Sequence, residues 1–264
     1  MEKDSYHQLL SYMSETARVL SADGGFPVDI YQIASSFHVD VKTSDDHKST
    51  NVRLRTTYEN QYKAVLPSYL KLDSGVQGLQ RFFIAHELGH IILRKMGVTS
   101  FKDSDYWLCE ELCNLFARNL LIPDKIVDSF FVKCSLDANS YLRGSFSLAK
   151  YAHVNWHTTA LRLSSKKPHL LFFAMKESVK KPEKLSVYFT TERSVIGIGK
   201  YISNDSAFRE TMSRNSFRKI VPISFEALQN EFPSLHSISS AAIFKLKRRE
   251  ECRICLVRKS ESPG

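Results

Sequence analysis

The sequence lacks the features that take a chain into or across a membrane. No apolar run reaches the roughly 18 residues that a membrane-spanning helix needs. The longest such stretches, around Phe82–Leu93 and His169–Met175, are too short or are broken by polar groups. The N-terminus, Met1-Glu2-Lys3-Asp4-Ser5, has neither the basic start nor the apolar stretch of a signal peptide. Repeats and low-complexity tracts are missing too, so we expect a cytoplasmic globular protein with no membrane partner.

Cysteines are few, and their number is odd. The five lie at positions 109, 113, 134, 252 and 255. A disulfide framework is therefore not expected, and reduced thiols are the default in the cytoplasm. Cys252-x-x-Cys255 has no second pair, so it indicates alternating strand residues rather than a zinc knuckle. For Cys109 and Cys113 a role as metal thiolates stays open, but small buried hydrophobes are favoured.

The charge of the chain is unbalanced, with a formal net charge of +9 over 264 residues. Such an excess favours acidic partners, nucleic acid among them. The basic residues are scattered, however, and the densest groups are only Lys166-Lys167, Lys180-Lys181 and Lys247-Arg248-Arg249. We therefore favour a solvated basic surface over a dedicated nucleic-acid site.

Hydrophobic periodicity divides the chain into a helical first part and a strand-rich last part. Helices are predicted at 6–21, 29–37, 79–95 and 107–121, with two short helices and a turn near 153–155 inside 147–163. A small sheet is predicted from 39–41, 52–54 and 62–67. Residues 164–168 suggest a linker, and strands follow at 170–175, 185–190, 241–246 and 252–257, the last two as a hairpin.

A candidate metal site lies in the helix predicted at 79–95, where the sequence runs His86-Glu87-Leu88-Gly89-His90. Two histidines four residues apart share one helix face, which suits a divalent metal, zinc above all. Glu87 is the candidate catalytic base, because the metal lowers the pKa of a bound water to about 7 and Glu87 can take its proton. Gly89 would let another segment approach closely. The apolar flanks predict that both histidines are largely buried.

A catalytic zinc needs a third protein ligand, and the next helix offers two carboxylates. Glu110 is four residues before Asn114, so the two share a helix face. Asn114 could then form a hydrogen bond with a ligand histidine and orient its ring, without binding the metal itself. Glu111 points about 100° away on the helix. We favour Glu110 and keep Glu111 as the competitor. Manganese or iron can occupy a His/His/carboxylate set as well.

Three segments resemble the ImmA/IrrE family of metallopeptidases. They are the run Arg81–Leu93 around the two histidines, the run Glu110–Pro123, and the helix-turn-helix-like stretch from Leu148 to Leu163. The resemblance covers about residues 25–165. Cys113 replaces the usual Ala, Ala152 replaces an aromatic residue, and Asn155 replaces Ser but can still cap a helix.

The resemblance implies a fold, a domain order and a function. It implies an α+β protein with a zincin-like peptidase domain over 1–125, a helix-turn-helix-like segment over 126–165, and a C-terminal α/β domain over 168–264. In the radiation-response branch of the family that last domain is a GAF-like sensor. It also implies metal binding by His86, His90 and Glu110, catalysis by Glu87, and cleavage of a helix-turn-helix repressor that switches on stress-response or mobile-element genes.

Alternatives of another class stay open. One is a regulatory protein with a structural metal that binds DNA or a partner protein, although the sequence offers only His157 and Arg162 for DNA contacts in the segment from Trp156 to Leu163. Another is a toxin-like or phage-encoded protease. Peptide hydrolysis also needs an oxyanion donor, and Tyr106, His153 and Arg118 are candidates.

Overall fold

The computed structural model describes residues 3–22, 24–43, 53–56, 62–66, 77–98, 105–131, 137–177, 184–192, 194, 196–202, 220–235, 238–245 and 252–258. Internal contacts divide the chain into two compact units. The first holds residues 1–127 and 149–159, and the second holds 128–148 and 160–264. The three-part division at 125, 165 and 168 stays a prediction. None of the described helices combines the length and apolar character needed to cross a bilayer.

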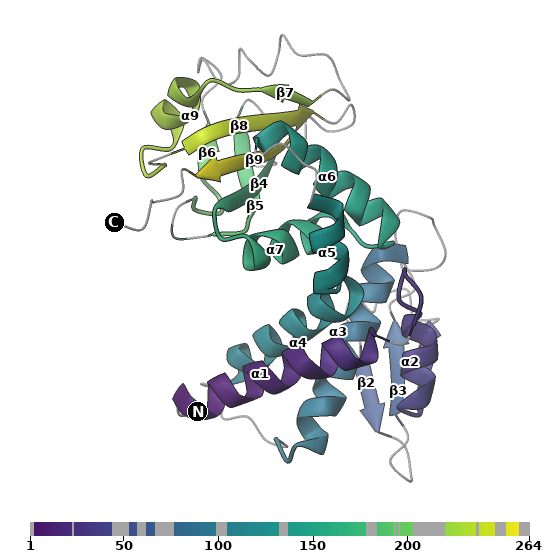
Figure 1. Ribbon diagram of the computed structural model, residues 1–264. Helices are drawn as coiled ribbons and strands as arrows, with labels where there is room; N and C mark the ends of the chain where they lie inside the picture. Colours follow the sequence, from purple (N-terminus) through teal and green to yellow (C-terminus); the bar gives the residue numbers. More distant parts are fainter. Residues whose placement is uncertain are drawn as a thin grey trace. The chain divides into compact units, whose positions relative to one another are not determined.

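Helices dominate the first unit. They are α1 (Lys3–Leu20), α2 (Ile30–Ser36), α3 (Gln77–Lys95), α4 (Tyr106–Leu121) and the start of α5 (Asp124–Phe131). All but α5 confirm helices predicted from the sequence, and α4 packs against both α1 and α3 (Figure 1). The amphipathic pattern of α1 buries Met13 and Ala17 completely.

A small sheet accompanies these helices, as predicted. Its strands are β1 (Val39–Thr43), β2 (Arg53–Thr56) and β3 (Tyr62–Leu66). The central β3 runs parallel to β1 and antiparallel to β2. Arg81 Nη2, on α3, donates a hydrogen bond of 2.6 Å to the carbonyl of Val28. This bond ties the start of α3 to the turn before α2 and so helps to fix the helix that carries the histidines.

The helix pair after α5 is longer than the sequence suggested. Helix α6 covers Ala138–Tyr151 and α7 covers Trp156–Lys166. The predicted start near 147 was wrong, since α6 begins at Ala138, where Asp137 Oδ1 accepts a hydrogen bond from the Ser140 N–H at 2.8 Å. Asn155 caps α7, accepting from the Thr158 N–H at 2.8 Å, as expected. Residues 164–166 are helical, so they are not part of an extended linker.

A six-stranded antiparallel sheet fills the second unit, in the order β6-β5-β4-β9-β8-β7. The strands predicted from the sequence are β4 (Leu170–Glu177), β5 (Leu185–Thr190), β8 (Ile238–Lys245) and β9 (Cys252–Arg258). The short elements β6 (Tyr201–Ile202), β7 (Ile220–Pro222) and α9 (Phe225–Glu231) were missed. The antiparallel β8–β9 pair confirms the predicted hairpin.

Both faces of this sheet are covered. On one face Phe173, Ile254 and Leu256 pack in a core cluster with Leu228 and Phe232, from α9 and the turn after it. On the other face the ring of Phe146, from α6, lies 4.6 Å from that of Phe244 on β8. Burial on both faces explains why β4 has an unbroken apolar run instead of alternation. Cys252 and Cys255, three residues apart on β9, therefore point to opposite faces as the strand prediction required.

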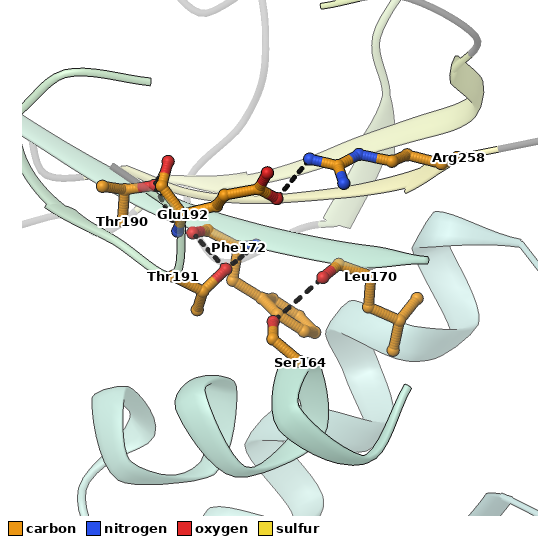
Figure 2. Close-up of polar contacts among 7 residues, drawn as sticks. All are labelled: Ser164, Leu170, Phe172, Thr190, Thr191, Glu192 and Arg258. Atoms are coloured by element: carbon orange, nitrogen blue, oxygen red, sulfur yellow. Dashed lines mark hydrogen bonds and ion pairs between the residues drawn. The ribbon is translucent and has the colours of Figure 1, made fainter. Parts of the chain in front are cut away.

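Polar contacts fasten the ends of β4 and β5 (Figure 2). The Thr191 hydroxyl accepts from the Phe172 N–H at 3.0 Å, and the Thr191 N–H donates to the Phe172 carbonyl at 2.9 Å. Ser164, in α7, donates its hydroxyl to the Leu170 carbonyl at 3.0 Å. Glu192 pairs with Arg258. The bond from Ser164 joins the last turn of α7 to β4, and the other contacts join the residues after β5 to β4 and β9.

Candidate metal centre

Helices α3 and α4 bring two histidines and one carboxylate to a common point. The Nε2 atoms of His86 and His90 lie 3.1 Å apart. Glu110 Oε2 is 3.3 Å from His86 Nε2, and its Oε1 is 3.3 Å from His90 Nε2. One ligand atom from each of the three residues lies within 4.8 Å of those of the other two, so the three form a group able to hold one metal ion.

Gly89, between the two histidines, allows the two helices to meet so closely. A Cβ atom at this position would lie 3.0 Å from Cys113 Cα and 3.2 Å from Cys113 Sγ. This confirms the close approach that was inferred for Gly89. His86 and Glu87 are each only 9% exposed, and the His90 side chain is 20% exposed. The predicted burial of the histidines is therefore confirmed.

The outer nitrogen of each histidine also has a partner on α4. His86 Nδ1 lies 2.9 Å from Asn114 Oδ1, as expected from the shared face of Glu110 and Asn114. His90 Nδ1 lies 3.4 Å from Cys113 Sγ. Because an amide oxygen only accepts, His86 Nδ1 must donate, and its Nε2 then presents a lone pair.

The donor set suits a cation at its centre. The Nε2 lone pair of His86 faces the carboxylate of Glu110, so two acceptors meet at 3.3 Å. A proton is a poor candidate near neutral pH, because burial lowers the pKa of His86 and lowers that of His90 to about 4. Two neutral imidazoles with a carboxylate are the ligands that zinc takes in catalytic sites. The residues present therefore fit a divalent metal.

Glu87 lies beside this group in an environment that favours its neutral form. Burial raises its pKa to about 7, nearby Glu110 adds to the rise, and Arg94 opposes it. A carboxylate with a pKa near 7 suits an acid–base role at neutral pH. The charge of Arg94 near Glu87 and His90 was not expected from the sequence, although Arg94 lies four residues after His90 on the same helix.

The sequence left open a competing metal ligand, Glu111, and three candidate oxyanion donors, and these residues lie in different parts of the first unit. Glu111 is exposed, and its charge acts on Tyr6 of α1; it is not in the group with the histidines. Tyr106 lies near the group, since the charge of Glu110 and a hydrogen bond to it raise the pKa of Tyr106. His153 occupies the turn between α6 and α7 with a φ of 53°. Arg118 is two helical turns beyond Glu110.

The cysteines of α4 are buried thiols. Burial raises the pKa of Cys109 to about 11 and raises that of Cys113 further. Neither sulfur belongs to the group of converging ligand atoms. The contact of Cys113 with His90 was not predicted, yet the spacing could have revealed it, because Glu110, Cys113 and Asn114 stand at i, i+3 and i+4 on one helix face.

Comparison with known proteins gives a family and a similar fold. A family model described as the IrrE N-terminal-like domain, of peptidase family M78, matches residues 34–164. A solved structure of a Mycobacterium tuberculosis transcriptional regulator is similar with a TM-score of 0.51 at 11% identity, covering 96% of this chain and 77% of that one. At this identity the likeness concerns the fold alone. No curated protein matches the chain significantly. Through its residues 34–164, the chain belongs to the IrrE N-terminal-like domain family of peptidases.

Proposed function

We propose that the chain is a metal-dependent endopeptidase with His86, His90 and Glu110 as metal ligands and Glu87 as the catalytic carboxylate. The observation that carries this proposal is the meeting of two imidazole Nε2 atoms and a carboxylate within 4.8 Å. Zinc is the metal that best suits this set, and manganese is the second choice. A site with three protein ligands leaves a coordination position open for chemistry.

Each residue has a defined task in this proposal. A divalent metal, when bound, supplies a Lewis acid for the attack of water on a peptide carbonyl. Glu87 accepts a proton at its carboxylate and can return it to the leaving amine, a role supported by its pKa of about 7. Asn114 fixes the ring of His86. Tyr106 is the best supported oxyanion donor of the three candidates, because it is half exposed and lies beside Glu110.

The substrate proposed is a helix-turn-helix transcriptional repressor, whose cleavage switches on stress-response or mobile-element genes. Membership of the peptidase family supports a protein substrate in general, and the repressor is the substrate that the resemblance to the ImmA/IrrE family implies. The sheet of the second unit supports a GAF-like sensor domain over 168–264, as in the radiation-response branch. We place the protein in the cytoplasm, where its four described cysteines, all free, would stay reduced.

A regulator that reads DNA through α7 is less well supported. Trp156, Thr158, Thr159, Ala160 and Arg162 of this helix are all buried. A helix that reads base edges must instead present several polar side chains to the groove. The net charge of +9 still allows a salt-dependent, sequence-independent attraction to DNA.

Substitution Glu87→Gln tests the proposal. Helix-turn-helix repressors encoded in the same genome would be incubated with the zinc-loaded wild type and variant, and cleavage followed by mass spectrometry. We expect cleavage by the wild type, a loss on the order of 10²–10⁴-fold in the variant, and equal zinc content in both. Equal cleavage by both proteins would contradict the role of Glu87, and loss of zinc from the variant would make Glu87 part of the binding site.

A further inference from the structure

In both histidines of the metal centre, the ring nitrogen that faces away from Glu110 contacts a residue of α4. For each ring, Nε2 points to the common centre with Glu110, so Nδ1 points away from it. Adjacent residues of α4 meet the two outer nitrogens: Asn114 Oδ1 at 2.9 Å from His86 Nδ1, and Cys113 Sγ at 3.4 Å from His90 Nδ1. The distance to sulfur is within the range of a hydrogen bond to that larger atom.

We propose that Cys113 is a positioning residue for His90: its sulfur accepts a hydrogen bond from Nδ1–H and so fixes the ring and the tautomer that leaves Nε2 free to bind metal. The inference rests on the proposed function, because it takes Nε2 of His90 as a metal ligand. A histidine that binds metal through Nε2 carries its proton on Nδ1, and such protons nearly always have an acceptor. Sulfur is a weak acceptor but meets this need.

Geometry also separates this role from direct ligation. Cys113 Sγ approaches the nitrogen of His90 that faces away from Glu110, so the thiol lies behind the ring and not at the centre. Its position is rigid, since the side chain is fully buried and Gly89 lies against it, with a hypothetical Cβ of Gly89 only 3.2 Å from Sγ. A thiol held in this way restricts rotation of the His90 ring.

Cys109 offers a matched control. It lies one turn before Cys113 on α4, is 1% exposed, and is a free thiol like Cys113. Replacing either cysteine with alanine removes one buried sulfur from the same helix. The two changes therefore carry a similar packing cost, but only Cys113→Ala removes the partner of His90.

The test is zinc affinity, measured on the full chain by competition with a chromophoric chelator. We expect Cys113→Ala to weaken zinc binding by about 10–100-fold, the usual effect of losing an outer partner of a ligand histidine. Cys113→Ser keeps an acceptor and should recover most of this loss, and Cys109→Ala should bind as the wild type does. Wild-type affinity in Cys113→Ala would overturn the proposal.

A spectroscopic readout separates positioning from general packing. In the cobalt-substituted protein, the exchangeable Nδ1–H of each ligand histidine gives a strongly shifted proton resonance. The wild type should show two such resonances in slow exchange with water. Cys113→Ala should broaden the signal of His90 alone, and Asn114→Ala that of His86 alone.

The outcomes keep the two proposals apart. A wild type that binds neither zinc nor cobalt would refute the proposed function itself. A wild type that binds metal but shows only one protected resonance would refute the role of Cys113 and leave the peptidase proposal intact. This last measurement needs no variant, so it decides the matter even if Cys113→Ala fails to fold.

Discussion

The contact between α3 and α4 buries a different kind of side chain from the sheet of the second unit. Between the two helices lie His86 and Glu87, each 9% exposed, with the pKa of Glu87 raised to about 7. The core cluster on one face of the sheet is apolar throughout apart from Cys252. Burying ionisable groups costs free energy, and proteins keep them buried mainly where they do chemistry. The comparison therefore supports the proposal that the helix pair carries the chemistry, whereas the sheet contributes stability.

The largest effect on stability is expected in the sheet. Phe173 is fully buried, and its ring lies 5.3 Å from that of Phe232. Phe173→Ala should lower the free energy of unfolding by about 3–5 kcal/mol, because it removes buried apolar surface and leaves a cavity. Urea unfolding measures this, with half-exposed Ile198→Ala as the control. The zinc affinity of the folded variant should be unchanged, and a parallel loss of affinity would break the comparison.

In the helix pair, the largest effect is expected from Glu110, the proposed third ligand. Glu110→Ala should weaken zinc binding by more than about 100-fold, since even an outer partner of a ligand costs 10–100-fold. Glu111→Ala is the matched control, one residue further along α4 with an exposed side chain. Elemental analysis after purification without chelators checks both variants. Zinc lost from Glu111→Ala and kept by Glu110→Ala would reverse the choice of carboxylate.

The pH dependence of stability should show the cost of burying Glu87. Burial raises the pKa of Glu87 in the folded chain from 4.5 to about 7. Folding of the metal-free protein is therefore favoured by the neutral form of Glu87 below pH 4.5, and this stabilisation is lost as the pH rises through 7. Glu87→Gln does not titrate there. The stability of the metal-free variant relative to the wild type should therefore rise between pH 4.5 and 7.5, by on the order of 1–3 kcal/mol. Urea unfolding at both pH values tests this, and a constant difference would show that Glu87 ionises freely.

The smallest effect is expected from the ion pair of Glu192 and Arg258 (Figure 2). Their side chains are 36% and 28% exposed, so solvent screens the attraction. Glu192→Gln should change the free energy of unfolding by no more than about 1 kcal/mol. Thermal unfolding at low and high salt measures this. A loss as large as that of Phe173→Ala would show that charge, and not apolar burial, holds the sheet together.

Local patterns predicted the long elements well and the short ones poorly. Helix α3 and helix α4 have sustained apolar periodicity, and β4, β5, β8 and β9 have strong apolar runs, so each was found from the sequence. Strands β6 and β7 have only two and three residues, too few for any period to show. The start of α6 was missed because Gly144 weakens the helical signal there. A glycine is required at this position because a Cβ atom would lie only 2.5 Å from the ring of Phe131.

The sequence by itself determined the identity of the candidate ligands. The i, i+4 spacing of His86 and His90 on a helix, and of Glu110 and Asn114 on the next, fixes which side chains share a face. Only the tertiary structure decided how those faces meet. Spacing along one helix carries no information on the rotation of a second helix against it. That rotation, which places Gly89 close against Cys113, brings Glu110 to both Nε2 atoms and turns Cys113 toward His90.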